Sequence, residues 1–268
     1  MMMIRPILLL LLSFFPFYSA EAGIVVLNAL SHTYKVENGK VYQGKIAIEN
    51  NGKQSQNVKL FLQDFSYQAD GTLYYSPPHS NIKSNAGWIR MNTNLITLRE
   101  KEKTEVYYEI TIPDHVSEPG SYWSVIMVEP VEDLRPDEST QGINITSVIR
   151  YAIQIITDLH TEKARPDLKF EGIKIEKQNG RQWLNIAVAN KGNLYCKPTV
   201  TIEIYNKGTG RKTGTFSGQA MGILPQTSKS FPIDIGKMPP SKYSAVLVAA
   251  DDDDNAFALT TELEIKNE

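Results

Sequence analysis

Hydrophobic and polar residues alternate along most of the chain after residue 22. The alternation is clearest in residues 105–112, where every second residue from Val106 onward is apolar. A period of two is typical of a β-strand that buries one face. No stretch of ten or more residues carries a convincing apolar stripe with the helical period of 3.6 residues. The pattern therefore predicts an all-β protein.

Turn residues separate the predicted strands at short intervals. Asn38-Gly39 and Asn179-Gly180 are the clearest signals, because Asn-Gly adopts the positive φ angles of a tight hairpin turn. We expect a hairpin at each of them. Residues 122–128 form a denser apolar run, which indicates a strand covered on both faces. Short strands between frequent turns are typical of a β-sandwich or a barrel.

The second half of the chain repeats landmarks of the first half in the same order. Residues 46–52 (IAIENNG) resemble residues 186–192 (IAVANKG). Further on, Tyr122 and Tyr243 each open an apolar strand after a turn that contains proline. Such a tyrosine is typical of a tyrosine corner, in which the hydroxyl bonds to the backbone of a crossing loop. The repeat indicates two copies of one fold, with extra chain at residues 76–94 of the first copy.

A polar, proline-containing stretch at residues 162–167 divides the two copies, as expected of a short linker. The sequence thus predicts a first domain at residues 23–162 and a second domain at residues 163–268. The Cys…Trp…Cys spacing of antibody domains is absent from both. We therefore expect two tandem antiparallel β-sandwiches of the immunoglobulin-like type.

Residues 1–22 have the three parts of a signal peptide. Arg5 supplies a positive charge, residues 7–17 are almost entirely apolar, and Ala20-Glu21-Ala22 forms a small-x-small cleavage site. The apolar run is shorter than the ~20 residues that a membrane span needs. We expect cleavage after residue 22 and export of a protein without a stable membrane span to the periplasm, the extracellular space or the cell surface.

The net charge and the single cysteine exclude some classes of function and of covalent structure. The chain has 28 Lys and Arg residues against 30 Asp and Glu residues, so its formal net charge is −2. It therefore lacks the basic balance that nucleic-acid binding needs. Cys196 is the only cysteine, which excludes an internal disulfide. We expect Cys196 to be a small buried side chain rather than a reactive thiol.

Motifs for catalysis or cofactor binding are missing from the sequence. The four histidines share no metal-ligand spacing, and there is no nucleophile elbow and no phosphate-binding glycine loop. The sequence thus predicts no enzyme and no cofactor, although two acids from distant strands could form a hydrolase site. One acidic run is a weak candidate for Ca²⁺, with a solvated turn as the alternative: Asp251, Asp252, Asp253 and Asp254.

The loop at residues 76–94 offers one partner-binding surface. It carries Trp88, and an aromatic side chain on a long loop can anchor a binding partner. Tyr74 and Tyr75 precede the loop and would complete the contact surface. The alternative is that Trp88 covers the end of the protein's own core.

A long strand predicted at residues 146–159 offers another surface. At a sheet edge, such a strand can pair with a strand of a partner through backbone hydrogen bonds. Arg150 lies on one face of this strand. The alternative is that the other face fills the protein's own core. That face carries Ile149, Tyr151, Ile153 and Ile155.

Several turn and core positions of the first half occur in a known arrangement: residues 46–52, Asp70-Gly71, Trp88-Ile89, residues 110–113 and residues 119–122. On these positions, residues 24–160 resemble the first domain of bacterial WxL-interacting proteins. They are more loosely similar to periplasmic pilus-assembly chaperones, which pair two immunoglobulin-like domains. Residues 165–268 resemble generic adhesion-type sandwich domains. The chaperones clamp a subunit's terminal carboxylate with a basic pair, and the resemblance makes Arg150 a candidate for one member.

We therefore expect a non-catalytic exported protein that binds a protein partner. In one hypothesis it is a periplasmic chaperone-like factor that assists assembly or presentation of a pilus or another surface structure, with the strand at residues 146–159 added to the partner. In the alternative hypothesis it is a cell-surface adhesion or scaffold module that binds glycan or protein through Tyr74, Tyr75 and Trp88. The identity of the partner and the oligomeric state stay open.

Overall fold

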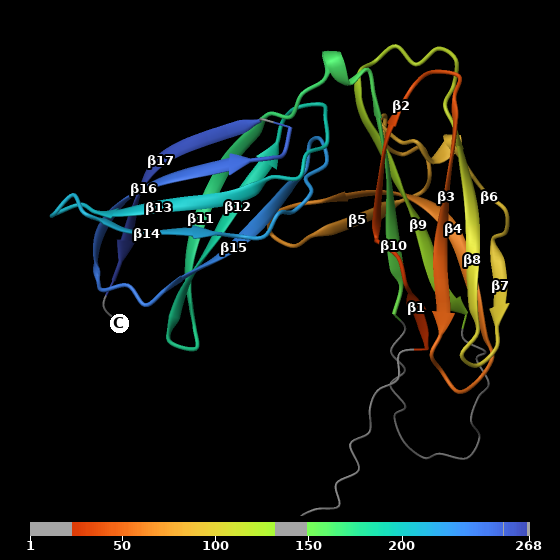
Figure 1. Ribbon diagram of the computed structural model, residues 1–268, viewed down its shortest axis with the longest axis horizontal. Helices are drawn as coiled ribbons and strands as arrows, with labels where there is room; N and C mark the ends of the chain where they lie inside the picture. Colours follow the sequence, from red (N-terminus) through yellow and green to blue (C-terminus); the bar gives the residue numbers. More distant parts are fainter. Residues whose placement is uncertain (1–22, 132–148, 254, 267–268) are drawn as a thin grey trace, which may run out of the picture.

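The computed structural model describes residues 23–131, 149–253 and 255–266. These residues form two β-sandwiches in succession, whose strands run in different directions (Figure 1). The predicted all-β fold of two tandem sandwiches is confirmed. The predicted signal peptide at residues 1–22 lies outside the described residues. The same holds for the beginning of the strand predicted at residues 146–159.

The first sandwich consists of two sheets that face each other. One sheet joins, in order, β1 (Ile24–Val26), β3 (Val41–Asn50), β8 (Lys103–Thr111) and β6 (Ile89–Met91). The other joins, in order, β2 (Ser31–Val36), β10 (Tyr151–Leu159), β9 (Gly120–Val131), β4 (Gln56–Tyr67) and β5 (Leu73–Ser76), with β7 (Leu95–Leu98) also paired to β4. Short 3₁₀ turns at Ala86–Trp88 (η1) and Thr161–Lys163 (η2) complete the elements.

Two sequence predictions for the first sandwich are wrong. The sheets are not entirely antiparallel, because β2 pairs with β10 in parallel. Asn38-Gly39 does not close a hairpin, since β2 and β3 on either side of it belong to different sheets. Both differences have one cause, which is that the chain crosses from one sheet to the other between β1 and β2 and crosses back at Gly39. The positive φ of Gly39 still makes the sharp turn that the dipeptide indicated.

The second sandwich also consists of two facing sheets. One joins, in order, β11 (Leu168–Gln178), β12 (Arg181–Asn190) and β15 (Ser228–Gly236). The other joins, in order, β14 (Lys212–Ser217), β13 (Thr199–Asn206), β16 (Ser241–Ala250) and β17 (Ala256–Ile265). Asn179 and Gly180 have φ angles of 51° and 73° and connect β11 to β12, so the hairpin predicted there is confirmed.

Strand β9 explains the dense apolar run at residues 122–128. Its Ile126 and Val128 point into the core of the first sandwich, whereas Trp123, Val125 and Met127 belong to a separate apolar cluster on the outer face of the same sheet. All five side chains are buried. The prediction of a strand covered on both faces is confirmed, and Leu224 and Tyr195 of the second sandwich contribute to the cover on the outer face.

The contact between the sandwiches is both apolar and hydrogen-bonded. Leu224 of the second sandwich packs in the outer cluster with Phe65, Tyr67 and Trp123 of the first. The Tyr67 hydroxyl donates to the Gly222 carbonyl and accepts from the Leu224 N–H, each at 3.0 Å. The hairpin of β4 and β5 extends along the second sandwich (Figure 1).

Gly120 marks the tightest approach between the two sandwiches. Its φ is +120°, and a Cβ at this position would lie 2.2 Å from the Asn193 carbonyl oxygen. The Ser121 N–H next to it donates to that same carbonyl at 2.8 Å. Only glycine fits here, because a side chain would meet the backbone of the second sandwich.

The repeat seen in the sequence has a structural counterpart at two buried asparagines. The Asn50 side-chain amide donates to the carbonyls of Gln54, Leu98 and Arg99, and its carbonyl accepts from the Gly52 N–H. Asn190 repeats this arrangement with Leu194, Ile223 and Gly192. Each asparagine thus satisfies buried backbone groups at the turn after its strand.

The two tyrosine corners are confirmed as well. The Tyr122 hydroxyl donates to the Glu118 carbonyl at 3.0 Å, and the Tyr243 hydroxyl donates to the Pro239 carbonyl at 2.7 Å. Each bond ties the loop before the strand to the end of the core.

Candidate functional site

Most of the described part of the strand predicted at residues 146–159 lies inside a sheet and not at its edge. Strand β10 pairs with β9 along its whole length and with β2 from Gln154 to Leu159. Ile153 and Ile155 are fully buried in the core of the first sandwich. The alternative interpretation of this face is therefore correct for these two residues, because their side chains point into the core of the first sandwich.

The neighbouring candidates lie closer to the surface. Ile149 and Arg150 are exposed, and Arg150 forms an ion pair of 3.0 Å with Glu129 of β9. Tyr151 packs against the first core, and its hydroxyl donates to the Ile24 carbonyl at 3.2 Å. Tyr151 therefore has a structural contact within the sandwich, whereas Ile149 and Arg150 are accessible to a partner.

Trp88, Tyr74 and Tyr75 do not form one surface. Trp88 is half-buried and packs on Tyr122, with 4.8 Å between ring centroids, so it covers the end of the first core. Tyr75 lies instead against Phe65 of the outer cluster, with 5.0 Å between the centroids. Tyr74 is the most exposed of the three.

The acidic run at the end of the second sandwich has the contacts of a turn. The Asp251 carboxylate accepts hydrogen bonds from the backbone N–H groups of Asp253 and Asn255 and from the Asn255 side chain. Asp252 lies in the same turn, and Asp254 is outside the described residues. Among the residues that are described, no group of three or more His, Cys, Asp and Glu side chains is placed to hold a metal ion.

Cys196 has the environment of a structural side chain. It is buried in the second core, and burial raises the pKa of its thiol to about 12. A thiol with such a pKa is almost entirely protonated at neutral pH and is therefore a poor nucleophile.

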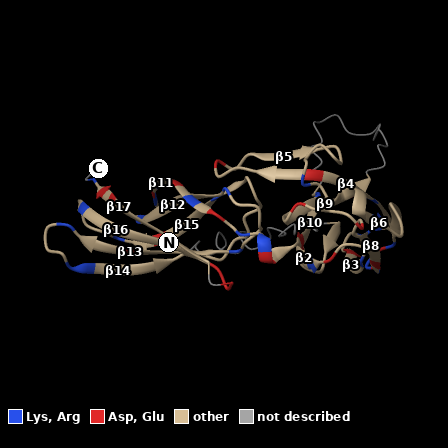
Figure 2. Cartoon of the chain, turned by 90° about the horizontal axis from the view of Figure 1, so that it is seen from above, with Lys and Arg blue, Asp and Glu red and all other residues tan. Residues whose placement is uncertain are grey.

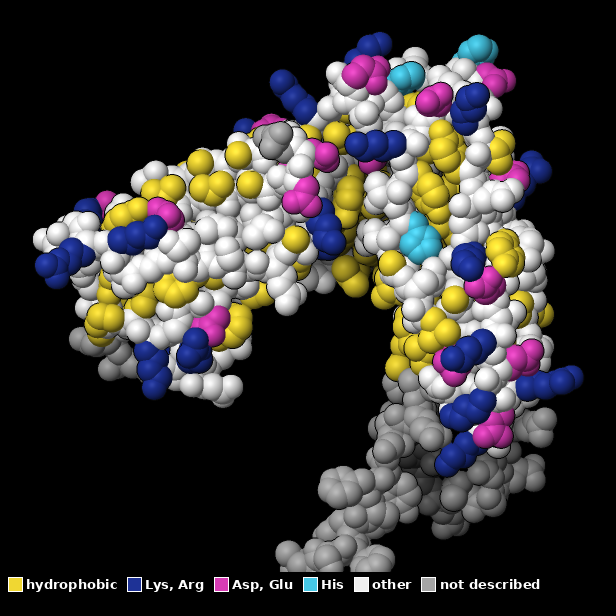
Figure 3. Space-filling model, viewed as in Figure 1, with side chains coloured by type: hydrophobic (Ala, Val, Ile, Leu, Met, Phe, Trp, Pro, Cys, Tyr) yellow, Lys and Arg dark blue, Asp and Glu magenta, His cyan; other side chains and the backbone are white. Residues whose placement is uncertain are grey.

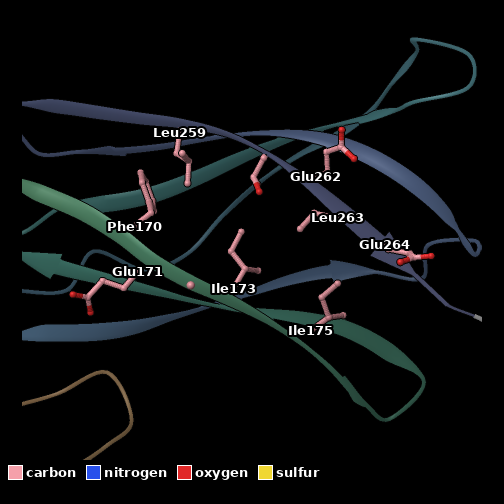
Figure 4. A pocket seen from close by; sticks show the side chains of 10 residues that line it. Phe170, Glu171, Ile173, Ile175, Leu259, Glu262, Leu263 and Glu264 are labelled. Carbon is pink, nitrogen blue, oxygen red and sulfur yellow. The ribbon is translucent and has the colours of Figure 1, made fainter.

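A surface hollow of the second sandwich lies between the edge strands β11 and β17. β11 belongs to one sheet and β17 to the other, and between them lies a hollow of about 360 Å³ (Figure 4). We call this hollow the β11–β17 seam. Its lining residues are Phe170, Glu171, Gly172, Ile173, Ile175, Leu259, Thr261, Glu262, Leu263 and Glu264.

The seam exposes apolar side chains that belong to the inner faces of the sheets. Ile175 lies opposite the fully buried Leu184, yet it is 38% exposed. Leu259 lies opposite the fully buried Leu247, yet it is 39% exposed. Because both point inward like their buried neighbours, their exposure means that the facing sheet does not extend far enough to cover them.

Carboxylates stand at the rim of the seam. Glu171, Glu262 and Glu264 are among its lining residues, and Glu262 and Glu264 alternate with the buried Leu263 and Ile265 and therefore face outward. Glu171 is paired with Lys191 at 2.9 Å and Glu262 with Lys207, both of which lie outside the lining. Elsewhere on the described chain, acidic and basic residues are mixed over both sandwiches (Figure 2).

Sequence reasoning missed the seam for a physical reason. The alternation along β11 and β17 is the same as in a fully covered strand, so it identifies Ile175 and Leu259 as inward-facing but not as uncovered. Which inward positions lack a cover depends on how many strands each sheet contains, and that number follows from pairings distant in sequence.

The second half of the chain matches a known family. Residues 140–268 match the family model described as WxL Interacting Protein, host binding domain. The resemblance to WxL-interacting proteins indicated by the sequence is thus confirmed, although the matched residues lie mainly in the second sandwich and not in residues 24–160. No curated protein matches the sequence.

Several solved structures match this chain at low sequence identity. A chain of the structure described as "Chaperone-tip adhesin complex is vital for synergistic activation of CFA/I fimbriae biogenesis" is 14% identical over 89% of this chain and 98% of that chain, with a TM-score of 0.47. The E. coli chaperone DraB is 12% identical over 91% and 96%, with a TM-score of 0.42. The Pseudomonas aeruginosa CupB2 chaperone is 9% identical over 89% and 100%, with a TM-score of 0.41.

Helical structure in the described ranges amounts to short 3₁₀ turns. None of it has the length and apolar character that a membrane-crossing helix requires.

Proposed function

We propose that this chain is an exported, non-catalytic binding protein whose second sandwich binds a protein of a host. The observation that carries the proposal is the match of residues 140–268 to a family described as a host binding domain. In this proposal the domains are residues 23–162 and 163–268, and residues 1–22 direct export to the cell surface or the surrounding space.

The geometry of the second sandwich supports this role. It projects away from the first sandwich, which leaves the face seen in Figure 3 accessible over most of its length. Its accessible features include the β11–β17 seam, where inward-facing Ile175 and Leu259 are uncovered. Apolar side chains at an open seam provide the contact area on which most protein recognition depends.

The proposal is tested with the mature chain, residues 23–268. The chain is immobilised and exposed to a panel of purified extracellular-matrix and serum proteins, and bound proteins are cross-linked and mapped by mass spectrometry. We expect at least one panel protein to bind, with cross-links concentrated in residues 163–268. Cross-links confined to residues 23–162, or no binding to any panel protein, would contradict the proposal.

A chaperone-like role in surface assembly is the second candidate, and a single observation favours it. β2 covers β10 only from Gln154 onward, so Tyr151–Ile153 keep one strand edge without a partner among the described residues. Arg150 lies beside this edge and could contact an anion of a partner subunit. Pull-down of a co-expressed surface subunit with Arg150→Ala tests the role, and unchanged recovery would count against it.

A further inference from the structure

We propose that the end of the second sandwich that lies away from the first sandwich binds an acidic patch on the surface of the protein partner. This inference rests on the proposed binding role of the second sandwich, and it adds the place and the charge of the contact. We call this end the distal end (Figure 1). It carries three turns between neighbouring strands, at residues 178–181, 207–212 and 237–242.

Every charged residue in these three turns is cationic. The strands of the second sandwich carry both acidic and basic residues, whereas the three turns contain no Asp or Glu. All six cationic side chains are exposed, and Figure 2 shows blue residues gathered at this end of the molecule. They are Arg181, Lys207, Arg211, Lys212, Lys237 and Lys242.

The three turns form one continuous surface. A Cβ added at Gly180 in the first turn would lie 4.0 Å from the side chain of Lys237 in the third. The Lys207 N–H of the second turn donates to the Lys242 carbonyl of the third at 3.1 Å. Because neighbouring turns are in contact, their charges act together on one surface of a partner.

The backbone of the second turn is held in place before a partner binds. The Asn206 side-chain carbonyl accepts hydrogen bonds from the N–H groups of Gly208 and Thr209, each at 3.0 Å. Gly210 has a φ of +69°, and its N–H donates to the Asn206 backbone carbonyl at 2.8 Å. A turn that is already ordered loses little conformational entropy on binding, so its cations are presented to a partner at low cost.

Half of the positive charge at the distal end is available to a partner. Three of the six cations pair with carboxylates on adjoining strands, at Glu203, Asp234 and Glu262. The other three form no ion pair with any residue that the structure describes. The unpaired cations are Arg211, Lys237 and Lys242. Asp or Glu side chains of a partner would pair with them.

The carboxylates beside the turns favour a protein patch over a uniformly anionic polymer. Glu203, Asp234 and Glu262 stand at the distal end, because each pairs with a cation of one turn. A sulfated polysaccharide or a nucleic acid has no cation to meet these carboxylates and would be repelled by them. An acidic protein patch sets Asp and Glu against the unpaired cations and also carries Lys or Arg for the carboxylates.

The test uses the mature chain, residues 23–268, and a fluorescent twelve-residue peptide of six Glu, two Lys and four Gly, followed by fluorescence anisotropy. The comparison ligands are the charge-reversed peptide of six Lys, two Glu and four Gly, and a heparin oligosaccharide with the net charge of the acidic peptide. At about 50 mM salt we expect the acidic peptide to bind about tenfold more tightly than either comparison ligand. This preference should disappear at about 500 mM salt, because salt screens exposed charges.

Matched variants locate the site. Arg211→Glu and Lys237→Glu each reverse an unpaired charge of the distal end. Lys197→Glu is the control, because it changes the net charge equally at an exposed residue before β13, at the opposite end of the second sandwich. We expect each distal variant to weaken binding of the acidic peptide about fivefold, and the control to stay within a factor of two of wild type. Lys237→Glu keeps the test decisive if Arg211→Glu fails to fold.

The same variants are measured with any host protein that wild type binds. Reversal of an exposed charge at the edge of a contact mainly slows association and changes its dependence on salt. We therefore expect both distal variants to lower the association rate several-fold at low salt, with little change in the dissociation rate.

Several outcomes overturn the inference. They are equal binding of the acidic and charge-reversed peptides by wild type, wild-type affinity in both folded distal variants, and tighter binding of the heparin oligosaccharide than of the acidic peptide, which would make a sulfated polysaccharide the occupant. Failure of the inference is distinct from failure of the proposed function. If both distal variants bind the host protein as wild type does, only the inference fails, whereas a wild type that binds no host protein contradicts the proposed function itself.

Discussion

Asp158 makes the stability of the contact between the sandwiches depend on pH. It lies on β10 opposite Ser121 of β9 and is only 6% exposed. The Ser121 hydroxyl donates to the Asp158 carboxylate at 2.5 Å and accepts from the Tyr195 N–H of the second sandwich at 2.7 Å. Burial raises the pKa of Asp158 to about 6, and the bond from Ser121 only partly opposes this effect.

The sign and size of the effect follow from this pKa. The ordinary value is 3.8, so between about pH 4 and pH 6 the folded protein binds a proton at Asp158 more readily than the unfolded chain does. The stability that this group contributes is therefore present at low pH and is lost as the pH rises through 6. The difference between the two pKa values corresponds to roughly 3 kcal/mol of unfolding free energy.

Asp158→Asn removes this titration while it retains a similar shape. The free energy of unfolding is measured by urea denaturation of wild type and variant at pH 4, 5, 6 and 7, followed by tryptophan fluorescence. We expect wild type to lose roughly 3 kcal/mol relative to the variant between pH 4 and pH 7. Contributions from other titrating groups cancel in the comparison.

Asp234→Asn is the matched control. Its partner Arg181 lowers the pKa of Asp234, so the stability this carboxylate contributes is lost as the pH falls, with the opposite sign. A difference between wild type and Asp158→Asn that is constant over the pH range, or that favours wild type as the pH rises, would refute the reasoning.

Three further predictions concern single contacts. Tyr67→Phe should lower the free energy of unfolding by about 2 kcal/mol, because it leaves the part-buried Gly222 carbonyl and the buried Leu224 N–H without their partner. Urea denaturation measures this change, and a loss below about 0.5 kcal/mol would contradict the prediction. Cys196 should react with a thiol reagent such as Ellman's reagent only in denaturant, and rapid labelling of the folded protein would show that it is accessible. Trp88→Ala should lower the free energy of unfolding by about 2–3 kcal/mol, because the ring packs on Tyr122. The same variant should bind the host protein as well as wild type does. Weaker binding at unchanged stability would show that Trp88 contacts the partner instead.

Local signals predicted the parts of the fold that depend on neighbouring residues. The hairpin at Asn179-Gly180 depends on the φ angles of two residues, and each tyrosine corner joins residues four apart. The coverage of β9 on both faces was also predictable, because residues 122–128 carry a single small polar side chain, Ser124, and so neither face suits contact with water.

Pairings distant in sequence were not predictable in the same way. Ile153 and Ile155 alternate as they would in an edge strand, and the sequence does not show that β2 pairs with β10 from Gln154 to Leu159. Asn85 was missed entirely, although it is fully buried and its amide donates to Tyr122, Ile155 and Thr157. A single asparagine in a loop carries no local sign that it will lie between two sheets. Candidate sites at strand edges therefore need the topology before they can be chosen.

The tight approach at Gly120 restricts how the halves of this protein can be exchanged or separated. Removing the residues after 160 would expose Trp123 and Phe65 to solvent, and we expect such a fragment to aggregate through this apolar surface. A chimera joining this first half to a foreign second half would need a backbone that fits against Gly120 as Asn193 does. The two halves are thus expected to be inherited and engineered as a unit, even though each has its own core.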